Sequence, residues 1–104
     1  MRSPYAMLGL LAALLLLPGR AAADPVASRG TALANACAAC HGPPGRSQGA
    51  IPSIDALSAE DFRAALQAFR ADTRKGTVMN RIAKGLDDAD IDVMAIYFAT
   101  LRQR

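Results

Sequence analysis

Hydrophobic residues recur along this chain with the spacing of helices, and no segment alternates with the period of two that strands require. The first such segment is Ala-rich and is predicted to be a helix from about Val26 into Cys40, because Pro25 stands near its start, where a helix tolerates proline. Gly30 and Cys37 lie on one face of it. Since Gly30 has no side chain, another helix could approach closely there.

Two further segments are predicted to be amphipathic helices. Ser58 is the expected N-cap of the first and Asp87 of the second, and acidic residues follow both caps, where the helix dipole favours them. The apolar positions of the first helix are Phe62, Ala65, Leu66 and Phe69. Those of the second are Ile91, Met94, Ala95, Phe98 and Leu101.

Loops connect these helices. Segment 42–57 is rich in glycine and proline, and segment 71–78 is polar and contains a glycine. A short helical turn over 80–84 is expected next, ended by Gly85 in the position just beyond the helix. The sequence therefore predicts an all-α protein with three main helices and one short helix.

The first 23 residues have the pattern of a cleaved signal peptide. Arg2 precedes an apolar run from Ala6 to Leu17, and small residues stand before Asp24. The run is shorter than the ~20 residues that span a bilayer, so we expect no stable membrane insertion after cleavage, and a retained anchor is the lesser alternative. We expect one mature domain, 24–104, exported to the periplasm.

Removing the leader changes the charge argument, because Arg2 and Arg20 leave with it. The formal charge of +3 for the whole chain then falls to about +1. With no aromatic and basic platform, the sequence offers no basis for nucleic-acid binding. A domain of roughly 80 residues has a thin core, and such domains usually need a metal, a disulfide or a cofactor.

The strongest chemical signal is Cys37-Ala-Ala-Cys40-His41, a CxxCH run of the kind that attaches c-type haem. Two thiols three residues apart on one helical turn can both reach one edge of a porphyrin, and the next residue offers its imidazole to the iron. Ile51, Pro52 and Ile54 would then pack on the haem edge.

Three other interpretations of the CxxC remain. A thioredoxin-like site would need a βαβ pattern, which is missing, and a zinc site would need ligands beyond His41, which is the only histidine. The third interpretation is a disulfide between Cys37 and Cys40 with His41 as a bystander. One covalently bound haem c is the cofactor that the motif, the leader and the small helical chain together favour.

A second axial ligand could come from Met79 or Met94, the two methionines outside the leader. Met94 lies on the apolar stripe of a regular helix and is better explained as a core residue. Met79 stands where a glycine-containing loop meets the short helix, and a loop can bring a side chain to an iron, so we assign Met79 as the axial ligand. With His41 and Met79 both bound, the iron would have no open position and would transfer electrons rather than bind small ligands.

Two groups of charged residues could have either a structural or a functional role. The carboxylates of Asp87, Asp88, Asp90 and Asp92 are best explained by helix capping and a solvated face. A basic group brackets Met79 in the sequence and could either surround the haem edge, where it would dock an acidic partner, or be solvated surface. This basic group consists of Arg70, Arg74, Lys75, Arg81 and Lys84.

With these residues in place, the chain resembles the class I cytochromes c over nearly all of segment 24–104. The resemblance implies a fold of three main helices and one short helix around a covalently attached haem. It implies thioethers at Cys37 and Cys40, and His41 and Met79 as axial ligands. Pro52 resembles the family's loop proline, whose carbonyl orients the proximal histidine. Gly30 and the pair Tyr97-Phe98 resemble the family's crossing of the first and last helices.

Two segments, Gly-Arg-Ser-Gln-Gly-Ala-Ile-Pro-Ser-Ile and Thr-Val-Met-Asn-Arg-Ile-Ala-Lys-Gly-Leu-Asp-Asp, are similar to the cytochrome subunit of flavocytochrome c sulfide dehydrogenase. In that family the haem subunit accepts electrons from a flavoprotein that oxidises sulfide. Some members have two haem domains, whereas this chain has one CxxCH.

The resulting hypothesis is a periplasmic monohaem cytochrome that transfers single electrons and is not an enzyme on its own. It would be the electron-accepting subunit of a sulfide dehydrogenase, with a flavoprotein as redox partner. The alternatives are a free diffusible carrier between other redox proteins, and a haem enzyme or small-ligand sensor in which Met79 is not bound.

Overall fold

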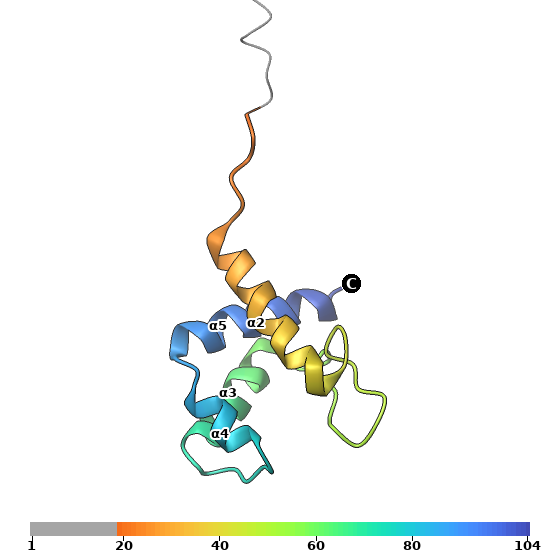
Figure 1. Ribbon diagram of the computed structural model, residues 1–104, viewed down its shortest axis with the longest axis vertical. Helices are drawn as coiled ribbons and strands as arrows, with labels where there is room; N and C mark the ends of the chain where they lie inside the picture. Colours follow the sequence, from red (N-terminus) through yellow and green to blue (C-terminus); the bar gives the residue numbers. More distant parts are fainter. Residues whose placement is uncertain (1–18) are drawn as a thin grey trace, which may run out of the picture.

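The computed structural model describes residues 19–104, which form four helices and no strand (Figure 1). The helices are α2 (Pro25–His41), α3 (Ala59–Arg70), α4 (Met79–Lys84) and α5 (Asp88–Arg102). The all-α prediction of three main helices and one short one is thus confirmed. Most of the expected leader lies outside the described residues, so the cleavage site and the domain boundary stay predictions. None of the described helices has the length and apolarity to cross a membrane.

Helix α2 is defined at both ends by residues that the sequence supplies for that purpose. The Asp24 side chain accepts a hydrogen bond from the Val26 amide at 2.9 Å, and Pro25 occupies the first turn. At the other end Gly42 has a φ of 78°, a left-handed value that favours glycine. Its amide donates to the Ala38 carbonyl at 3.0 Å. The helix therefore ends directly after His41.

Helices α2 and α5 pack across each other (Figure 1), and Gly30 of α2 lies close to α5. A Cβ atom added to Gly30 would lie 2.9 Å from the backbone oxygen of Val93. This confirms the close helix approach predicted for Gly30. The contact is one turn before Tyr97 and Phe98, so this aromatic pair is not what meets Gly30 itself.

The Gly30 contact gives a direct stability prediction. We expect Gly30→Val to lower the free energy of unfolding by about 2 kcal/mol, because the added atoms press on backbone that cannot rotate away. Thermal or denaturant unfolding of the haem-loaded protein measures the loss. The matched control is Gly49→Val, since nothing lies within 4 Å of a Cβ added to Gly49. Equal stability of the Gly30→Val variant and the parent would contradict the close crossing.

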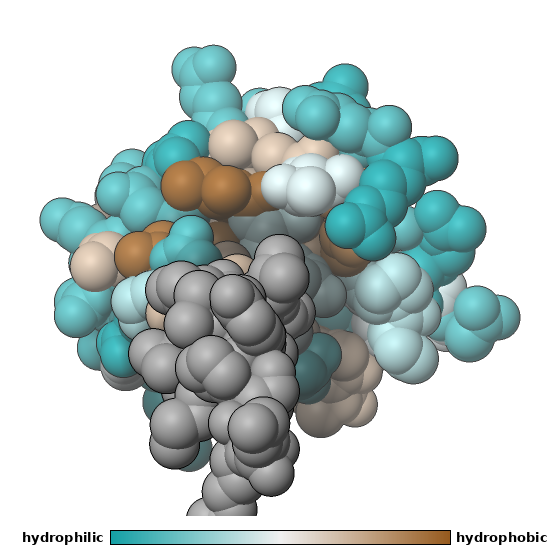
Figure 2. Space-filling model, turned by 90° about the horizontal axis from the view of Figure 1, so that it is seen from above, coloured by the Kyte–Doolittle hydropathy of each residue, from teal (hydrophilic) through white to brown (hydrophobic). Residues whose placement is uncertain are grey.

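The core is formed mainly by α3 and α5, with Ala34 of α2 and Ala83 of α4. Ile91, Met94 and Phe98 of α5 are almost completely buried, and Phe62 of α3 stacks on Phe98 with ring centroids 5.2 Å apart. Tyr97 meets Phe98 edge-on at 5.3 Å. Seen from above the view of Figure 1, the surface outside the residues drawn in grey is mainly hydrophilic with a few hydrophobic groups (Figure 2). The predicted apolar stripes of both helices thus form the core.

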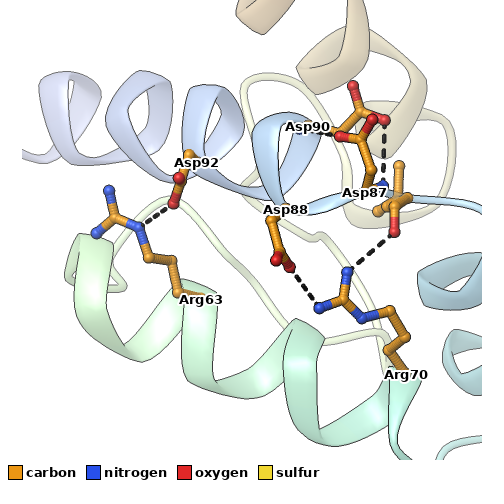
Figure 3. Close-up of polar contacts among 7 residues, drawn as sticks. Arg63, Arg70, Asp87, Asp88, Asp90 and Asp92 are labelled. Atoms are coloured by element: carbon orange, nitrogen blue, oxygen red, sulfur yellow. Dashed lines mark hydrogen bonds and ion pairs between the residues drawn. The ribbon is translucent and has the colours of Figure 1, made fainter.

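The carboxylates at the start of α5 cap this helix and pair with arginines of other helices (Figure 3). Asp87 accepts from the Asp90 amide at 2.7 Å, and the Asp90 carboxylate accepts in return from the Asp87 amide, which is a capping box. The three ion pairs are Arg29–Asp90 to α2, and Arg63–Asp92 and Arg70–Asp88 to α3. Capping is confirmed, but Asp90 is 7% exposed and so does not belong to a solvated face.

The Arg29–Asp90 pair predicts how acid affects stability. Hydrogen bonds from Arg29, followed by those from Asp87, lower the pKa of Asp90 below its usual value. The charged carboxylate therefore stabilises the fold above pH ~4, and this contribution disappears as the pH falls through the lowered pKa.

We expect Asp90→Asn to be less stable than the parent at neutral pH and to lose less stability than the parent between about pH 5 and pH 2. Unfolding midpoints measured across this range provide the test. The control is Asp92→Asn, which removes a pair exposed to solvent on both sides and should change stability little. A gap between parent and Asp90→Asn that is the same at every pH would contradict the linkage.

Helix α4 begins at Met79, one residue before the predicted start, and ends at Lys84. Gly85 follows it as expected, but its φ is −83°, which any residue adopts. Its amide instead donates to the Ile82 carbonyl at 3.0 Å, a turn that does not need the left-handed backbone. Gly85 thus ends the helix where expected, without a left-handed backbone.

Candidate functional site

Two thiols and an imidazole share the last turn of α2. Cys37 is half-buried and Cys40 is exposed, and both are free thiols. The sulfur of Cys37 lies 3.9 Å from the sulfur of Met94. Burial raises the pKa of the Cys37 thiol, and the neighbouring Cys40 adds to the rise. Before a haem is attached, the Cys37 thiol is therefore protonated at neutral pH.

The imidazole of His41, which follows directly, is oriented by the loop after α2. Its Nδ1 lies 2.5 Å from the backbone carbonyl oxygen of Pro52, which can only accept, so Nδ1 carries the hydrogen. In the neutral imidazole Nε2 then has a free lone pair, which is the form of histidine that binds a metal. The structure thus brings together two residues that the sequence places 11 positions apart.

The 42–57 loop holds the Pro52 carbonyl in place through several internal contacts. The Gly45 carbonyl accepts from the amides of Ile54 at 2.7 Å and Asp55 at 3.2 Å. The Arg46 guanidinium pairs with the Asp55 carboxylate at 2.9 Å. These contacts close the loop on itself around the carbonyl that faces His41.

An open groove runs between the end of α2 and this loop. Cys40 lines it from the helix and Ile51 from the loop, together with Ala38, Ala39, Gly42, Pro43 and residues 47–50. Ile51 is 45% exposed beside this groove. Ile54 is half-buried and packs against the hydrophobic core, and its contact with the haem edge stays a prediction.

Met79 is the first residue of α4, at the end of the 71–78 loop, as the sequence predicts. Its side chain is half-buried against the core. Val78 and Ile82, which flank it, are 58% and 47% exposed. Met94 is only 1% exposed, in agreement with its interpretation as a core methionine.

The helix that carries the thiols and the helix that carries Met79 do not touch each other. Helix α2 packs on α5, α4 packs on α3, and α3 packs on α5. The thiols and Met79 are thus on separate helices that are linked through α5 and α3. This donor set fits a haem: two thiols, an imidazole with a free Nε2, and a thioether on another element. Ile51, Val78 and Ile82 offer exposed apolar surface near these donors.

Three of the five basic residues that bracket Met79 are engaged within the protein. Arg70 pairs with Asp88 at 2.5 Å, Lys84 pairs with Asp72 at 2.6 Å, and the Arg74 guanidinium lies 4.7 Å above the ring of Phe69. The hydrogen bond and the charge of Lys84 lower the pKa of Asp72, and a hydrogen bond from Asn80 adds to this effect. These five basic residues therefore do not form a ring of unpaired cations.

Comparison with known proteins decides the family. A model of the cytochrome c family matches residues 27–102, which include every donor described above. The chain belongs to the cytochrome c family.

Similar proteins include several small cytochromes. The cytochrome subunit of sulfide dehydrogenase from Chlorobaculum tepidum is 43% identical over 77 residues, which cover 74% of this chain and 70% of the relative. Cytochrome c-553 from Desulfomicrobium norvegicum is 34% identical over 70 residues, 64% of this chain and 88% of the relative. The thiosulfate dehydrogenase electron acceptor of Stutzerimonas stutzeri is 39% identical over 72 residues, 65% of this chain but only 33% of the relative.

Membership of the cytochrome c family confirms three predictions made from the sequence. The cofactor is covalently attached haem c, the fold is that of a class I cytochrome c, and the chain is an electron-transfer protein. The role of each individual residue remains a prediction.

Sequence reasoning missed one residue of the site region, Asn80. Its side chain makes four hydrogen bonds to the segment before Met79, three of them to the backbone. An asparagine within a polar segment has no periodic pattern, and backbone partners leave no trace in the sequence. The only available signal was its position directly after the proposed ligand.

Proposed function

We propose that Cys37 and Cys40 form the two thioether bonds to the haem of this cytochrome, with His41 and Met79 as its axial ligands. The observation that carries this proposal is the contact between His41 Nδ1 and the Pro52 carbonyl. This contact favours the tautomer in which Nε2 is free. A histidine that binds a metal through one ring nitrogen usually donates the hydrogen of the other ring nitrogen to such a carbonyl. Pro52 is accordingly proposed as a positioning residue that acts through its backbone.

The haem supplies a one-electron redox centre, and the residues of the chain determine what it can do. A histidine and a thioether together leave no open iron position, and thioether ligation raises the reduction potential. This favours an electron carrier over the alternative of a haem enzyme or small-ligand sensor. Half-buried Met79 at the start of α4 is the residue on which this choice depends.

The proposed redox partner is the flavoprotein of a sulfide dehydrogenase, in the periplasm after removal of residues 1–23. The 43% identity to the cytochrome subunit of sulfide dehydrogenase from Chlorobaculum tepidum supports this partner. A free carrier is the second candidate, and the similarity to cytochrome c-553, which covers 88% of that protein, favours it.

A reduction assay with sulfide separates the two candidates. The oxidised cytochrome is mixed with sulfide, alone and together with a flavoprotein subunit of sulfide dehydrogenase from the same host, and haem reduction is followed by absorbance. We expect fast reduction only with the flavoprotein, and co-elution of the two proteins on size exclusion. Fast reduction without co-elution would favour the free carrier, and no acceleration by the flavoprotein would contradict the proposed partner.

A further inference from the structure

Asn80 connects the proposed iron ligand to the loop that precedes it. The two N–H donors of its side-chain amide are shared among three acceptors, the carbonyl oxygens of Arg74 at 2.7 Å and Phe69 at 3.1 Å and Asp72 Oδ1 at 3.1 Å. Its side-chain oxygen accepts from the backbone amide of Gly76 at 2.8 Å. One half-buried side chain thus satisfies both ends of the 69–76 segment.

This hydrogen bonding matters because residues 71–76 have no core packing of their own. Their other restraints are the backbone hydrogen bonds at the end of α3 and the Lys84–Asp72 ion pair. Residues 71–78 are all exposed and contribute nothing to the hydrophobic core. Asp72 adopts a φ of 58°, a left-handed value that costs free energy for a residue with a side chain. The loop therefore keeps its shape through polar contacts, and Asn80 provides more of them than any other side chain among the described residues.

The same loop packs directly against Met79. A Cβ atom added to Gly76 would lie 3.3 Å from the Cβ of Met79 and 2.9 Å from the ring of Phe69. The space between Gly76 and Met79 therefore leaves no room for a side chain at position 76, and the hydrogen bond from the Gly76 amide to Asn80 holds the glycine there. Met79 thus lies between Gly76, whose backbone faces it, and Asn80, which follows it in the chain.

We propose that Asn80 is the positioning residue that keeps Met79 on the haem iron, by fastening the 69–76 segment against it. This inference rests on the proposed role of Met79 as ligand and adds the group that controls how often Met79 leaves. An external ligand binds ferric iron only when Met79 is away, so its apparent affinity reports the population of that open state.

The test measures imidazole binding to the oxidised, haem-loaded protein. Losing the Asn80 hydrogen bonds should increase the open population about tenfold, so Asn80→Ala should bind imidazole about tenfold more tightly than the parent. Its weak sulfur-to-iron absorption band should also disappear at a lower imidazole concentration. Asn80→Asp provides a second variant of the same size: it can accept from Gly76 but can no longer donate to the two carbonyls, and it should change in the same direction.

A control separates positioning from a general loss of stability. Arg29→Gln removes the ion pair to Asp90, which joins α2 to α5 and does not involve the 69–76 segment. It should lower the unfolding midpoint and leave imidazole affinity unchanged. If both Asn80 variants lose stability while their imidazole affinity stays within twofold of the parent, Asn80 has only a structural role and the inference is wrong.

The parent protein tells this failure apart from failure of the proposed ligand. A parent without the sulfur-to-iron band would overturn Met79 as ligand, and the inference with it. A parent with the band, together with Asn80 variants of unchanged affinity, would overturn the inference alone.

Discussion

Replacing Met79 by leucine should remove the weak sulfur-to-iron absorption band of the oxidised protein and let carbon monoxide bind quickly to the reduced form. Leucine keeps the size of the side chain but has no thioether, so one iron position would open. The reduction potential should fall by on the order of 0.1–0.3 V, a part of the roughly 0.8 V over which axial ligands set haem potentials. Absorption spectra and a redox titration measure both effects.

Met94→Leu is the matched control for this experiment. Met94 is almost completely buried and its sulfur lies near Cys37, so the exchange should cost less than about 1.5 kcal/mol and leave the band in place. If the band is lost in Met94→Leu and kept in Met79→Leu, Met94 rather than Met79 is the iron ligand, and our assignment is wrong.

The double variant Cys37→Ser/Cys40→Ser should carry no covalently bound haem. Serine oxygens do not form the thioether bonds, so acidified organic solvent should extract all the haem, whereas the parent should keep its haem through the same treatment. Because a domain of roughly 80 residues has a thin core, the variant without haem should also lose most of its cooperative unfolding transition.

The two single variants test each cysteine separately. Cys40 is exposed and Cys37 half-buried, and each variant should keep one thioether bond and so retain its haem under extraction. Full retention of haem by the double variant would mean that these cysteines are not the attachment points.

The sequence predicts those parts of the fold that depend on local physics. Ser58 and Asp87 were expected as N-caps, and their side chains accept from the amides of Asp61 and Asp90. The close approach at Gly30 was also expected, because a glycine on the inner face of a helix leaves room for a neighbour. Helix periodicity and capping are encoded over a few adjacent residues, so they can be read directly.

Contacts between distant segments could not be predicted in the same way. The partners of Arg29 and Arg63 are 61 and 29 positions away, and nothing in the local pattern selects one acidic residue over another. The role of Asn80 was missed because three of its partners are backbone atoms. The contact between His41 and the Pro52 carbonyl was expected only through resemblance to a family, since the carbonyl is common to every residue.

The candidate site was likewise predictable where its features depend on local sequence. The spacing of Cys37, Cys40 and His41 on one helical turn is a local property, and the structure places them together as expected. The choice of Met79 over Met94 rested on one being in a loop and the other in a core helix, and the half-buried and fully buried positions agree with that distinction.

The most direct test of the account is an absorption spectrum of the purified protein, oxidised and reduced, after production in a host that exports the chain and attaches haem c. The account predicts one covalently bound haem per chain, with the sharp reduced bands of a six-coordinate c-type haem and the weak sulfur-to-iron band when oxidised. A colourless protein would contradict the assignment of Cys37, Cys40 and His41, and a haem spectrum without the sulfur-to-iron band would contradict that of Met79.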